Sequence, residues 1–428
     1  MPRNVSGEYF RGCRAGAGGI NRGMKTIYQG VSGRSLGFWA AIPLMVSAIL
    51  GSARARGAES DPKALARDNI AFAVSLYGKL APTEGNLFFS PYSISSAMGM
   101  TYAGARENTA AEMAKALEFA ATPDQLPTAF KSLNAAVQAS ARSGGHNLNI
   151  ANGICLTGGD VSTEFKAVLR DKFETEVFAG GLDKINGWVK AKTEGKIEKI
   201  LEKLSPNSAC VLLSAIYFKG SWASQFKREA TQDAPFRPAT GKEVTVPLMY
   251  HKGQFKLLEK DGFQALVMPY SGKTLSMVIF LPEAVDGLAA LEKTLTAETL
   301  TQWLAEADKQ TERKTQVFVP RFKLETGYDL VPPCQALGIK DAFDSDKADF
   351  SGMGWPKGEM WIAQIKHKAY VDVNEEGTEA AGATAVEIQA RSLQRYPVFR
   401  ADHPFLFVIR DHTTDSILFA GRLSDPSK

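Results

Sequence analysis

One segment near the C-terminal end of this 428-residue chain combines two properties that rarely occur together. Residues 375–392 read EEGTEAAGATAVEIQARS, so the first half is almost entirely Ala, Gly, Thr and Glu. From Thr378 onward, one alternate set of residues is small or apolar and uncharged, whereas the other carries Glu379 and Glu387. A period of two is the pattern of a half-buried strand. Because Gly and Ala hold a strand poorly against water, we expect a strand here only where a sheet offers a slot.

A segment that is a loop when alone and a strand when given a slot can change between two states. The sequences on either side of it, YVDVN and YPVFRADHPFLFVIRD, both predict strands. The pattern leaves two alternatives open, an ordinary surface loop and a permanent strand. The hypothesis of a change of state requires a large sheet that can accept one further strand.

The rest of the chain predicts an α+β fold, because helix patterns dominate the first half and strand patterns the second, without regular alternation. The first helix is marked by Asp61-Pro62, a helix cap followed by a first-turn proline. The continuous apolar run at 208–222 is typical of a strand that is covered on both faces. No internal repeat or Pro/Gly/Ser linker interrupts residues 56–428, which we therefore interpret as a single domain. The remaining elements are a short strand and a helix within 86–105 and two strand pairs within 265–282 and 404–423.

The first 55 residues are arranged as a secretory signal. Lys25 and Arg34 precede an apolar core, LGFWAAIPLMVSAILG at 36–51, and Ala53-Arg54-Ala55 follows as a small-x-small cleavage site. The core is short and contains a proline, so an uncleaved membrane anchor is the alternative. We expect residues 1–55 to be a leader, with Met24 as a second candidate start, and the mature protein to be secreted, either extracellular or periplasmic.

Composition argues against several classes of function. The net charge is only +4 and no block of like charges occurs, so we expect no nucleic-acid partner and no stable membrane association. Cys155 and Cys210 lie in apolar runs and are interpreted as buried small side chains rather than as disulfide or metal ligands. No GxSxG or phosphate-binding motif occurs, which disfavours an enzyme, and we expect no cofactor and no metal. His367, in IKHKAYVDV, fits a structural histidine on an interior strand better than a catalytic base.

Over about residues 60–425 the chain resembles the serpins. Residues 375–383 are similar, almost letter for letter, to the hinge of an inhibitory serpin's reactive-centre loop. The resemblance implies an α+β serpin fold with three β-sheets, about eight to nine helices and an exposed reactive-centre loop at about 375–397. Five further stretches resemble family blocks in the family's order: NLFFSPYSISSAM, AIYFKGSW, VPRFKLETGYDL, LGIKDAFDSDKADFSGM, and DHPFLFVIRD with ILFAGRL.

What the resemblance implies about function is a suicide-substrate inhibitor of serine proteases, expected to be a monomer and not an enzyme. A target protease cleaves the loop, the hinge inserts into the central sheet, and the attached protease stays trapped as an acyl-enzyme. The inward hinge residues Thr378, Ala380 and Gly382 include neither a charge nor Pro, which favours a working inhibitor over a non-inhibitory binding or chaperone protein. The hinge residues are Gly377, Thr378, Glu379, Ala380, Ala381, Gly382 and Ala383.

The family's spacing places the reactive bond at Arg391-Ser392, because Glu375 then corresponds to the seventeenth residue before it. An Arg on the acyl side fits a trypsin-like protease, whose specificity pocket ends in a carboxylate. Ala390 and Arg395 are the alternative bait residues, and a cysteine protease or an elastase-like protease is the alternative target.

Two further groups of residues follow from the resemblance. In the first group, a buried polar cluster, Ser214 stands where many serpins have Asn. This departure removes an amide and is expected to loosen the cluster. In the second, an ion pair between Glu375 and Arg321 would hold the hinge closed, although a surface pair of little energetic value is the alternative. The first group, the shutter, contains Ser90, Ser93, Ser214 and His367, and the second, the breach, contains Trp222, Arg321 and Glu375.

Overall fold

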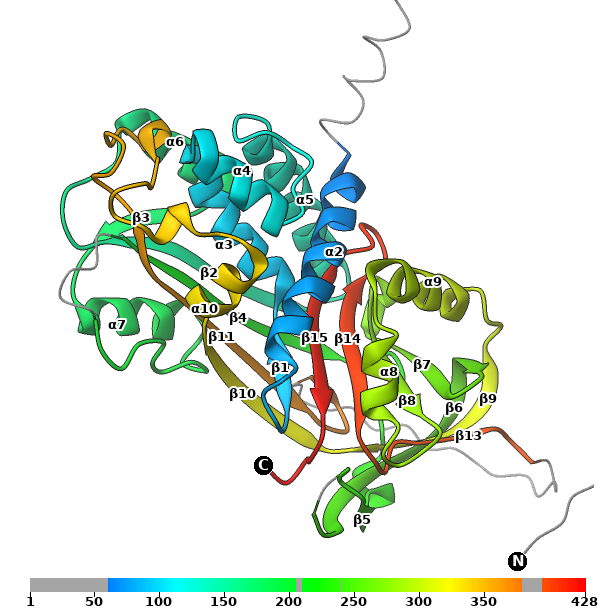
Figure 1. The fold of residues 1–428 in the computed structure, drawn as a ribbon. Coiled ribbons are helices and arrows are strands. Elements are labelled where there is room, and N and C mark those ends of the chain that lie inside the picture. Colours follow the sequence, from blue (N-terminus) through cyan, green and yellow to red (C-terminus); the bar gives the residue numbers. More distant parts are fainter. Residues whose placement is uncertain (1–60, 205–209, 240, 379–394) are drawn as a thin grey trace, which may run out of the picture. The chain divides into compact units, whose positions relative to one another are not determined.

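The computed structural model describes residues 61–204, 210–239, 241–378 and 395–428, which belong to one compact unit, residues 51–428. Helices occupy most of the first half of the chain and strands most of the second, as predicted for an α+β fold (Figure 1). Several predicted features lie outside the described residues: the leader at 1–55, the hinge residues Glu379, Ala380, Ala381, Gly382 and Ala383, and the bond Arg391-Ser392.

Local sequence signals explain where the helices begin. Asp61 accepts a hydrogen bond from the Lys63 amide and Pro62 occupies the first turn, as the sequence predicted. The helices of the described residues are α2 (Pro62–Leu80), α3 (Pro91–Gly104), α4 (Glu107–Ala116), α5 (Leu126–Ser143), α6 (Thr163–Phe173), α7 (Leu182–Lys192), α8 (Leu288–Lys293), α9 (Ala297–Asp308) and α10 (Val331–Leu337). The described part of the chain also has four short 3-10 turns, at Arg228–Ala230, Ser271–Lys273, Asp341–Phe343 and Ser351–Met353.

The strands form two hydrogen-bonded networks. The first is the central sheet, in the order β10 (Phe322–Asp329), β11 (Ile362–Val373), β12 (Gly377–Thr378), β4 (Cys210–Ser221), β2 (Asn147–Leu156) and β3 (Glu176–Ala179). The second runs β1 (Leu87–Phe89), β15 (Ile417–Leu423), β14 (Phe405–Asp411), β8 (Leu275–Pro282), β7 (Phe263–Pro269), β6 (Val244–Lys260), β9 (Arg313–Pro320) and β13 (Val398–Arg400), with β5 (Gln232–Phe236) beside β6.

The two networks contain the three predicted sheets, because the second network consists of two sheets that share the long strand β6. Its last residues, from Lys256, pair with β7, whereas the preceding residues pair with β9 and β5. The long strand therefore continues from one sheet into the next. The strand pairs predicted within 265–282 and 404–423 are β7 with β8 and β14 with β15, both antiparallel.

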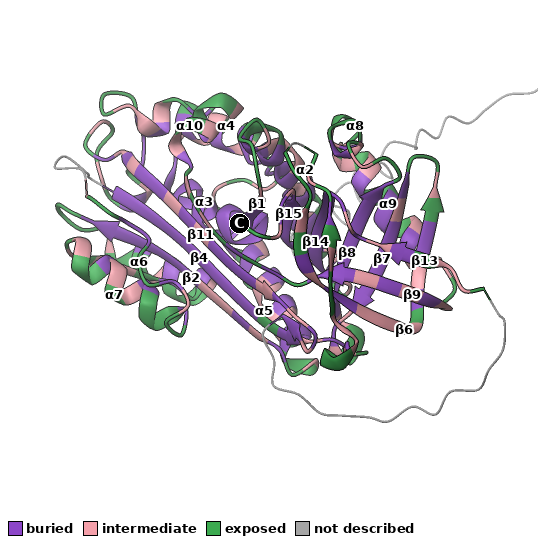
Figure 2. Ribbon diagram, turned by 90° about the horizontal axis from the view of Figure 1, so that it is seen from below, coloured by how far each residue is buried: buried purple, intermediate pink, exposed green. Residues whose placement is uncertain are grey.

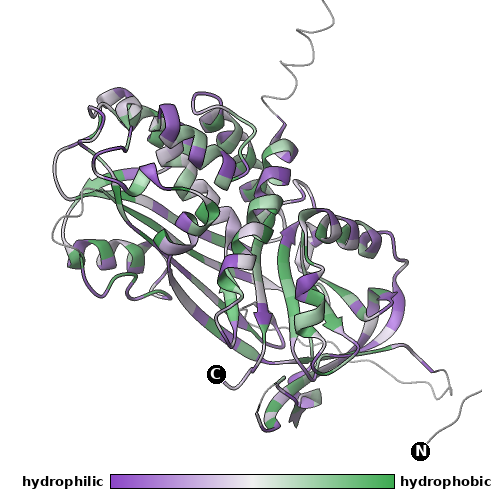
Figure 3. Ribbon diagram, in the orientation of Figure 1, coloured by the Kyte–Doolittle hydropathy of each residue, from purple (hydrophilic) through white to green (hydrophobic). Residues whose placement is uncertain are grey.

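The central sheet separates two hydrophobic cores, and β4 contributes to both. Alternate β4 residues, such as Leu212 and Ile216, belong to the larger core, and those between them, such as Leu213 and Tyr217, belong to the smaller core beside α7. This explains the continuous apolar run of the sequence, because every residue from 210 to 218 is buried (Figure 2). Hydrophobic residues likewise dominate β8 and β14 (Figure 3).

The three cysteines of the described residues are free and buried, in agreement with the interpretation of Cys155 and Cys210 from the sequence. Cys155 lies in the smaller core and Cys210 in the larger core, on opposite faces of neighbouring strands. A disulfide between these two residues is therefore excluded by the sheet geometry, since paired cysteines need side chains directed toward each other.

We predict that Phe88→Ala lowers the free energy of unfolding by about 3–5 kcal/mol, because Phe88 is fully buried and its replacement leaves a cavity. Its ring stacks on Phe407 and Phe419, at centroid distances of 5.8 and 5.2 Å. Urea denaturation followed by circular dichroism measures the effect. Val398→Ala, at a position 46% exposed, is the control and should change stability by less than about 0.5 kcal/mol. Equal effects of the two substitutions would contradict the assignment of Phe88 to the core.

Candidate functional site

The centre of the site is the pairing between β4 and β11, which we call the seam. These two strands pair in parallel from Cys210 and Ile362 at one end to Tyr217 and Tyr370 at the other. Both belong to the middle of the central sheet (Figure 2). A further strand between β4 and β11 can enter only if these ladder bonds break, so the seam is closed over this length.

Beyond the tyrosine pair the seam is already open, and β12 occupies the opening. Thr378 pairs antiparallel with Val373 of β11 on one side and with Gly220 of β4 on the other. The Thr378 side chain is fully buried, and its hydroxyl lies 2.8 Å from the Tyr270 hydroxyl. The first two hinge residues thus form a strand where the sequence pattern predicted one, and Thr378 points inward as expected.

Gly377 can be replaced by no other residue without strain. Its φ angle is +153°, in a region that residues with a side chain rarely adopt. A Cβ atom added here would lie 2.1 Å from the Gly220 carbonyl oxygen. The backbone of β12 therefore approaches β4 more closely than any side chain at position 377 would allow.

The predicted breach residues meet around the start of β12. Arg321 donates a 2.5 Å hydrogen bond to Glu375 Oε1, and Thr231 donates another at 2.7 Å. Glu375 is only 2% exposed, whereas the Arg321 side chain is 45% exposed. Burial by itself raises the pKa of Glu375, but the hydrogen bonds from Arg321 and Thr231 outweigh it, so the pKa lies below its usual value.

Trp222 holds the chain just before β12 by two hydrogen bonds. Its ring nitrogen donates to the Asn374 carbonyl and its amide to the Glu376 carbonyl, each at 3.0 Å. The indole also stacks on Tyr270, with ring centroids 4.5 Å apart. Tyr270 and Thr231 were missed in the sequence analysis because each reaches the hinge from a distant segment without a recognisable motif.

The predicted shutter residues form one buried network below β4 and β11. Ser90 caps α3, and its amide donates to His367 Nε2 at 3.0 Å. The Ser214 hydroxyl lies 3.0 Å from His367 Nδ1 and 2.9 Å from the Ser93 hydroxyl. The network therefore crosses from α3 to both strands of the seam.

Asn152 of β2 brings an amide into the shutter, next to Ser214, which was expected to loosen the shutter by removing one. Its side chain accepts from the Ser93 hydroxyl at 2.8 Å and donates to the Ser93 carbonyl at 3.1 Å. Asn152 pairs with Ser214 in the β2 to β4 register, so an amide enters the network from the adjacent strand. Sequence reasoning missed Asn152 because only the strand register reveals it.

His367 is held in one neutral tautomer. A backbone amide can only donate, so Nε2 accepts from Ser90 and the proton is on Nδ1, which lies 3.0 Å from the Ser214 carbonyl oxygen. Complete burial lowers the pKa of His367 to about 3, although the hydrogen bond to Ser214 acts in the opposite direction. Its interpretation as a structural histidine agrees with these contacts.

One Ser, His and Asp group resembles a hydrolase triad in its residue types. The Ser276 hydroxyl lies 2.8 Å from His412 Nε2, and His412 Nδ1 lies 3.8 Å from Asp308. Ser276 is 0% exposed, so no substrate can reach the hydroxyl. Within the described residues, no group of three or more metal-ligating side chains occurs, and no helix combines the length and apolar character that a membrane crossing demands.

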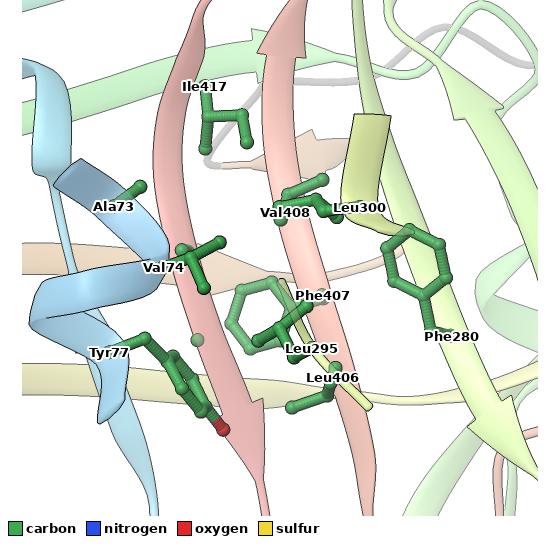
Figure 4. Close-up of a pocket in the computed structure, with 12 residues that line it drawn as sticks. Ala73, Val74, Tyr77, Phe280, Leu295, Leu300, Leu406, Phe407, Val408 and Ile417 are labelled. Atoms are coloured by element: carbon green, nitrogen blue, oxygen red, sulfur yellow. The ribbon is translucent and has the colours of Figure 1, made fainter. Parts of the chain in front are cut away.

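An apolar cavity of about 30 Å³ lies between α2 and the strands β14 and β15 (Figure 4). It has room for about one water molecule, far below the several hundred Å³ of sites for drug-sized ligands. Its lining includes Val74, Tyr77, Leu300 and Val408. This cavity does not support a carrier function for a small molecule.

Comparisons with known proteins agree with this geometry. The family model described as "Serpin (serine protease inhibitor)" matches residues 67–426. Human Serpin B8 is 42% identical over 381 residues, and horse leukocyte elastase inhibitor is 40% identical over 384 residues; each match covers 85% of this chain and 99% of the relative. The crystal structure of tengpin, a thermophilic serpin in its native state, has a TM-score of 0.76 and 27% identity, covering 84% of this chain and 93% of tengpin.

The breach ion pair leads to an asymmetric prediction. Arg321→Met should lower the free energy of unfolding by about 1–3 kcal/mol, because the buried Glu375 carboxylate then lacks its charged partner. Glu375→Gln should cost less, because the half-exposed Arg321 that remains is solvated. Equilibrium urea denaturation of both variants measures the difference. A larger cost for Glu375→Gln would contradict this account.

The shutter leads to a prediction about pH. The pKa of His367 is about 3 in the folded protein and 6.5 in the unfolded chain, so protons bind the unfolded chain preferentially below pH 6.5. Its contribution to stability is complete above pH 6.5 and is lost as the pH falls toward 3. Between pH 7.5 and 5 this loss amounts to about 2 kcal/mol, at about 1.4 kcal/mol per pH unit. His367→Gln removes this titration, so the stability difference between the two proteins should shrink by that amount. Parallel pH profiles of stability would refute the assignment.

Proposed function

The chain belongs to the serpin family, and we propose that it is a secreted suicide-substrate inhibitor of trypsin-like serine proteases. The family model names protease inhibition, and the relatives include a leukocyte elastase inhibitor, so this is an inhibitor family and not an enzyme family. We propose a mechanism, a target class, a bait residue and export for this chain.

The proposal rests on the seam between β4 and β11. It is closed over most of its length, and the first hinge residues already lie between the two strands at its open end. β4 and β11 pair from Cys210 to Tyr217, and β12 lies between the same two strands just beyond. Residues that follow Thr378 can therefore extend β12 along the seam without a change of direction. Each added residue would gain ladder hydrogen bonds worth about 1 kcal/mol each, whereas the uncleaved loop is tied at both ends.

Insertion would convert cleavage into inhibition. The target serine attacks the bait carbonyl and forms an acyl-enzyme, with release of the new amino terminus. Insertion of the hinge then moves the esterified protease away from the loop's original position. Hydrolysis of the ester needs an intact oxyanion hole and general base, so distortion of the protease leaves the ester in place.

We propose Arg391 as the bait residue and Ser392 as the residue after the cleaved bond. The support is the family spacing from Glu375. Arg321 donates a hydrogen bond to the Glu375 carboxylate, and the Phe226 amide donates one to the Glu375 carbonyl. The name of the horse relative, leukocyte elastase inhibitor, favours one second candidate, an elastase-like target. Ala390 would then be the better bait, because a small side chain fits a small specificity pocket.

Export remains part of the proposal and rests on the leader. The basic residues, apolar core and small-x-small site within residues 24–55 support secretion to an extracellular or periplasmic location. Amino-terminal sequencing of protein secreted by the native host would test it, with a start near residue 56 as the expected result. Recovery of the protein only inside cells would refute export.

We predict that mixing the protein with trypsin gives a band of summed mass that survives denaturing electrophoresis, because the ester bond persists. Mass spectrometry should identify a released peptide that begins at Ser392. Arg391→Ala should abolish this band with trypsin while leaving the fold intact. A stable band with elastase, and a peptide that begins at Arg391, would instead support the elastase-like target.

A hinge variant separates trapping from cleavage. Thr378→Arg places a charge at a fully buried position between β4 and β11, so insertion should fail while the bait bond stays available. We expect cleavage of this variant without the covalent band. Cleavage of the unmodified protein without the band, by trypsin and by elastase alike, would contradict inhibition and favour the non-inhibitory binding or chaperone function.

A further inference from the structure

Lys196 lies over Tyr217 and Tyr370, the last pair of the closed part of the seam, next to the end that β12 occupies. Its ammonium is 5.9 Å from the ring centroid of Tyr217 on β4 and 5.9 Å from that of Tyr370 on β11. The two rings meet edge to face with centroids 6.1 Å apart, and their residues are the last β4 to β11 pair before β12. One cation thus contacts both strands at the point where insertion must begin.

The turn after α7 fixes the position of this lysine. The buried Thr193 hydroxyl donates to the Val189 carbonyl and accepts from the Ile197 amide, and Gly195 has a φ angle of +78°. Ile197 is fully buried in the smaller core that also contains both tyrosines. Lys196 is therefore directed at the seam by a turn whose neighbouring residues are anchored on either side.

The same turn is attached to only one half of the central sheet. Glu194 accepts hydrogen bonds from Asn147 and Asn149 of β2, at 2.7 and 3.0 Å. β2 pairs with β4 along its whole length, so the turn moves with the β4 side. Of the two aromatic contacts, the one to Tyr217 lies within this half, and the one to Tyr370 crosses the seam.

A new strand between β4 and β11 would roughly double their separation, from about 4.8 to about 9.6 Å. Lys196 cannot then remain within about 6 Å of both rings, the range in which a cation and an aromatic ring attract. The cross-seam contact exists only while the seam is closed. It therefore stabilises the closed state and opposes the first step of opening.

We propose that Lys196 is a positioning residue that clamps the open end of the seam through Tyr217 and Tyr370 and so sets the rate of loop insertion. The inference rests on the proposed insertion mechanism and adds the residue that regulates it. A clamp at this place controls whether the hinge inserts before the acyl-enzyme is hydrolysed, and so how much inhibitor becomes covalent complex rather than cleaved product.

The chain supplies a matched control on the same ring. Lys323 lies 5.1 Å from the Tyr370 centroid, but β10, which carries it, pairs with β11 and stays with that strand when the seam opens. Loss of the Lys323 contact changes the surroundings of Tyr370 without removing a contact across the seam. Lys196→Met keeps the length of the side chain without its charge, and Lys196→Arg keeps the cation.

Insertion is measured with a fluorescently labelled synthetic peptide of residues 379–390, added to the full protein and followed as bound label on native gels. We expect Lys196→Met to speed peptide insertion about three- to tenfold, the effect of one lost cation and aromatic contact on a rate. Lys323→Met and Lys196→Arg should stay within about twofold of the unmodified protein. With trypsin, Lys196→Met should also increase the ratio of covalent complex to cleaved inhibitor.

An unchanged rate for Lys196→Met, or an equal increase for Lys323→Met, would overturn the clamp while leaving the proposed function intact. If the peptide inserts into none of the proteins, the unmodified one included, the insertion mechanism itself fails and the clamp fails with it. The two failures are therefore distinguishable.

Discussion

The rest of the structure depends on the parallel pairing of β4 with β11. Because neither strand follows the other in the chain, their pairing is held by what surrounds them rather than by a connecting turn. The shutter network joins both strands to α3 from one face, through His367 and Ser214. On the other face, the tyrosine pair lies beneath Lys196. The seam is thus held at two separate points that must both yield before a strand can enter.

These two points differ in chemistry, and so they respond to different conditions. The shutter is a buried network whose histidine stays neutral, because burial lowers its pKa to about 3. Its contribution to stability falls at low pH, because the unfolded chain then binds the proton preferentially. The clamp is a half-buried cation over two aromatic rings. The breach adds a third element, where a buried carboxylate depends on a partly exposed arginine. In the proposed mechanism, opening would begin at the end with the breach and the clamp, because Arg321 and Lys196 there are partly exposed.

The sequence predicted the elements of the fold far better than it predicted the contacts between them. The helix at Asp61-Pro62 and the strand predicted within 208–222 depend on local signals. The helix is present, and the structure shows the strand at Cys210–Ser221. The resemblance also named residues that do meet, such as Glu375 with Arg321. Asn152 and Lys196 could not be found in this way, because the role of Asn152 arises from strand register and that of Lys196 from a contact across the seam. Neither arrangement leaves a pattern in a single sequence.

In the proposed mechanism, the position of the first hinge residues would let insertion be fast without being spontaneous. β12 has already replaced the β4 to β11 pairing at one end, so no new opening has to form, and each further step exchanges one pair of ladder bonds for two. The first exchange is the costly one, because it separates Tyr217 from Tyr370 before the residue after Thr378 gains its partners. A barrier concentrated in that step lets one substitution change the rate while leaving the final inserted state unaltered, since the contact it removes is absent there.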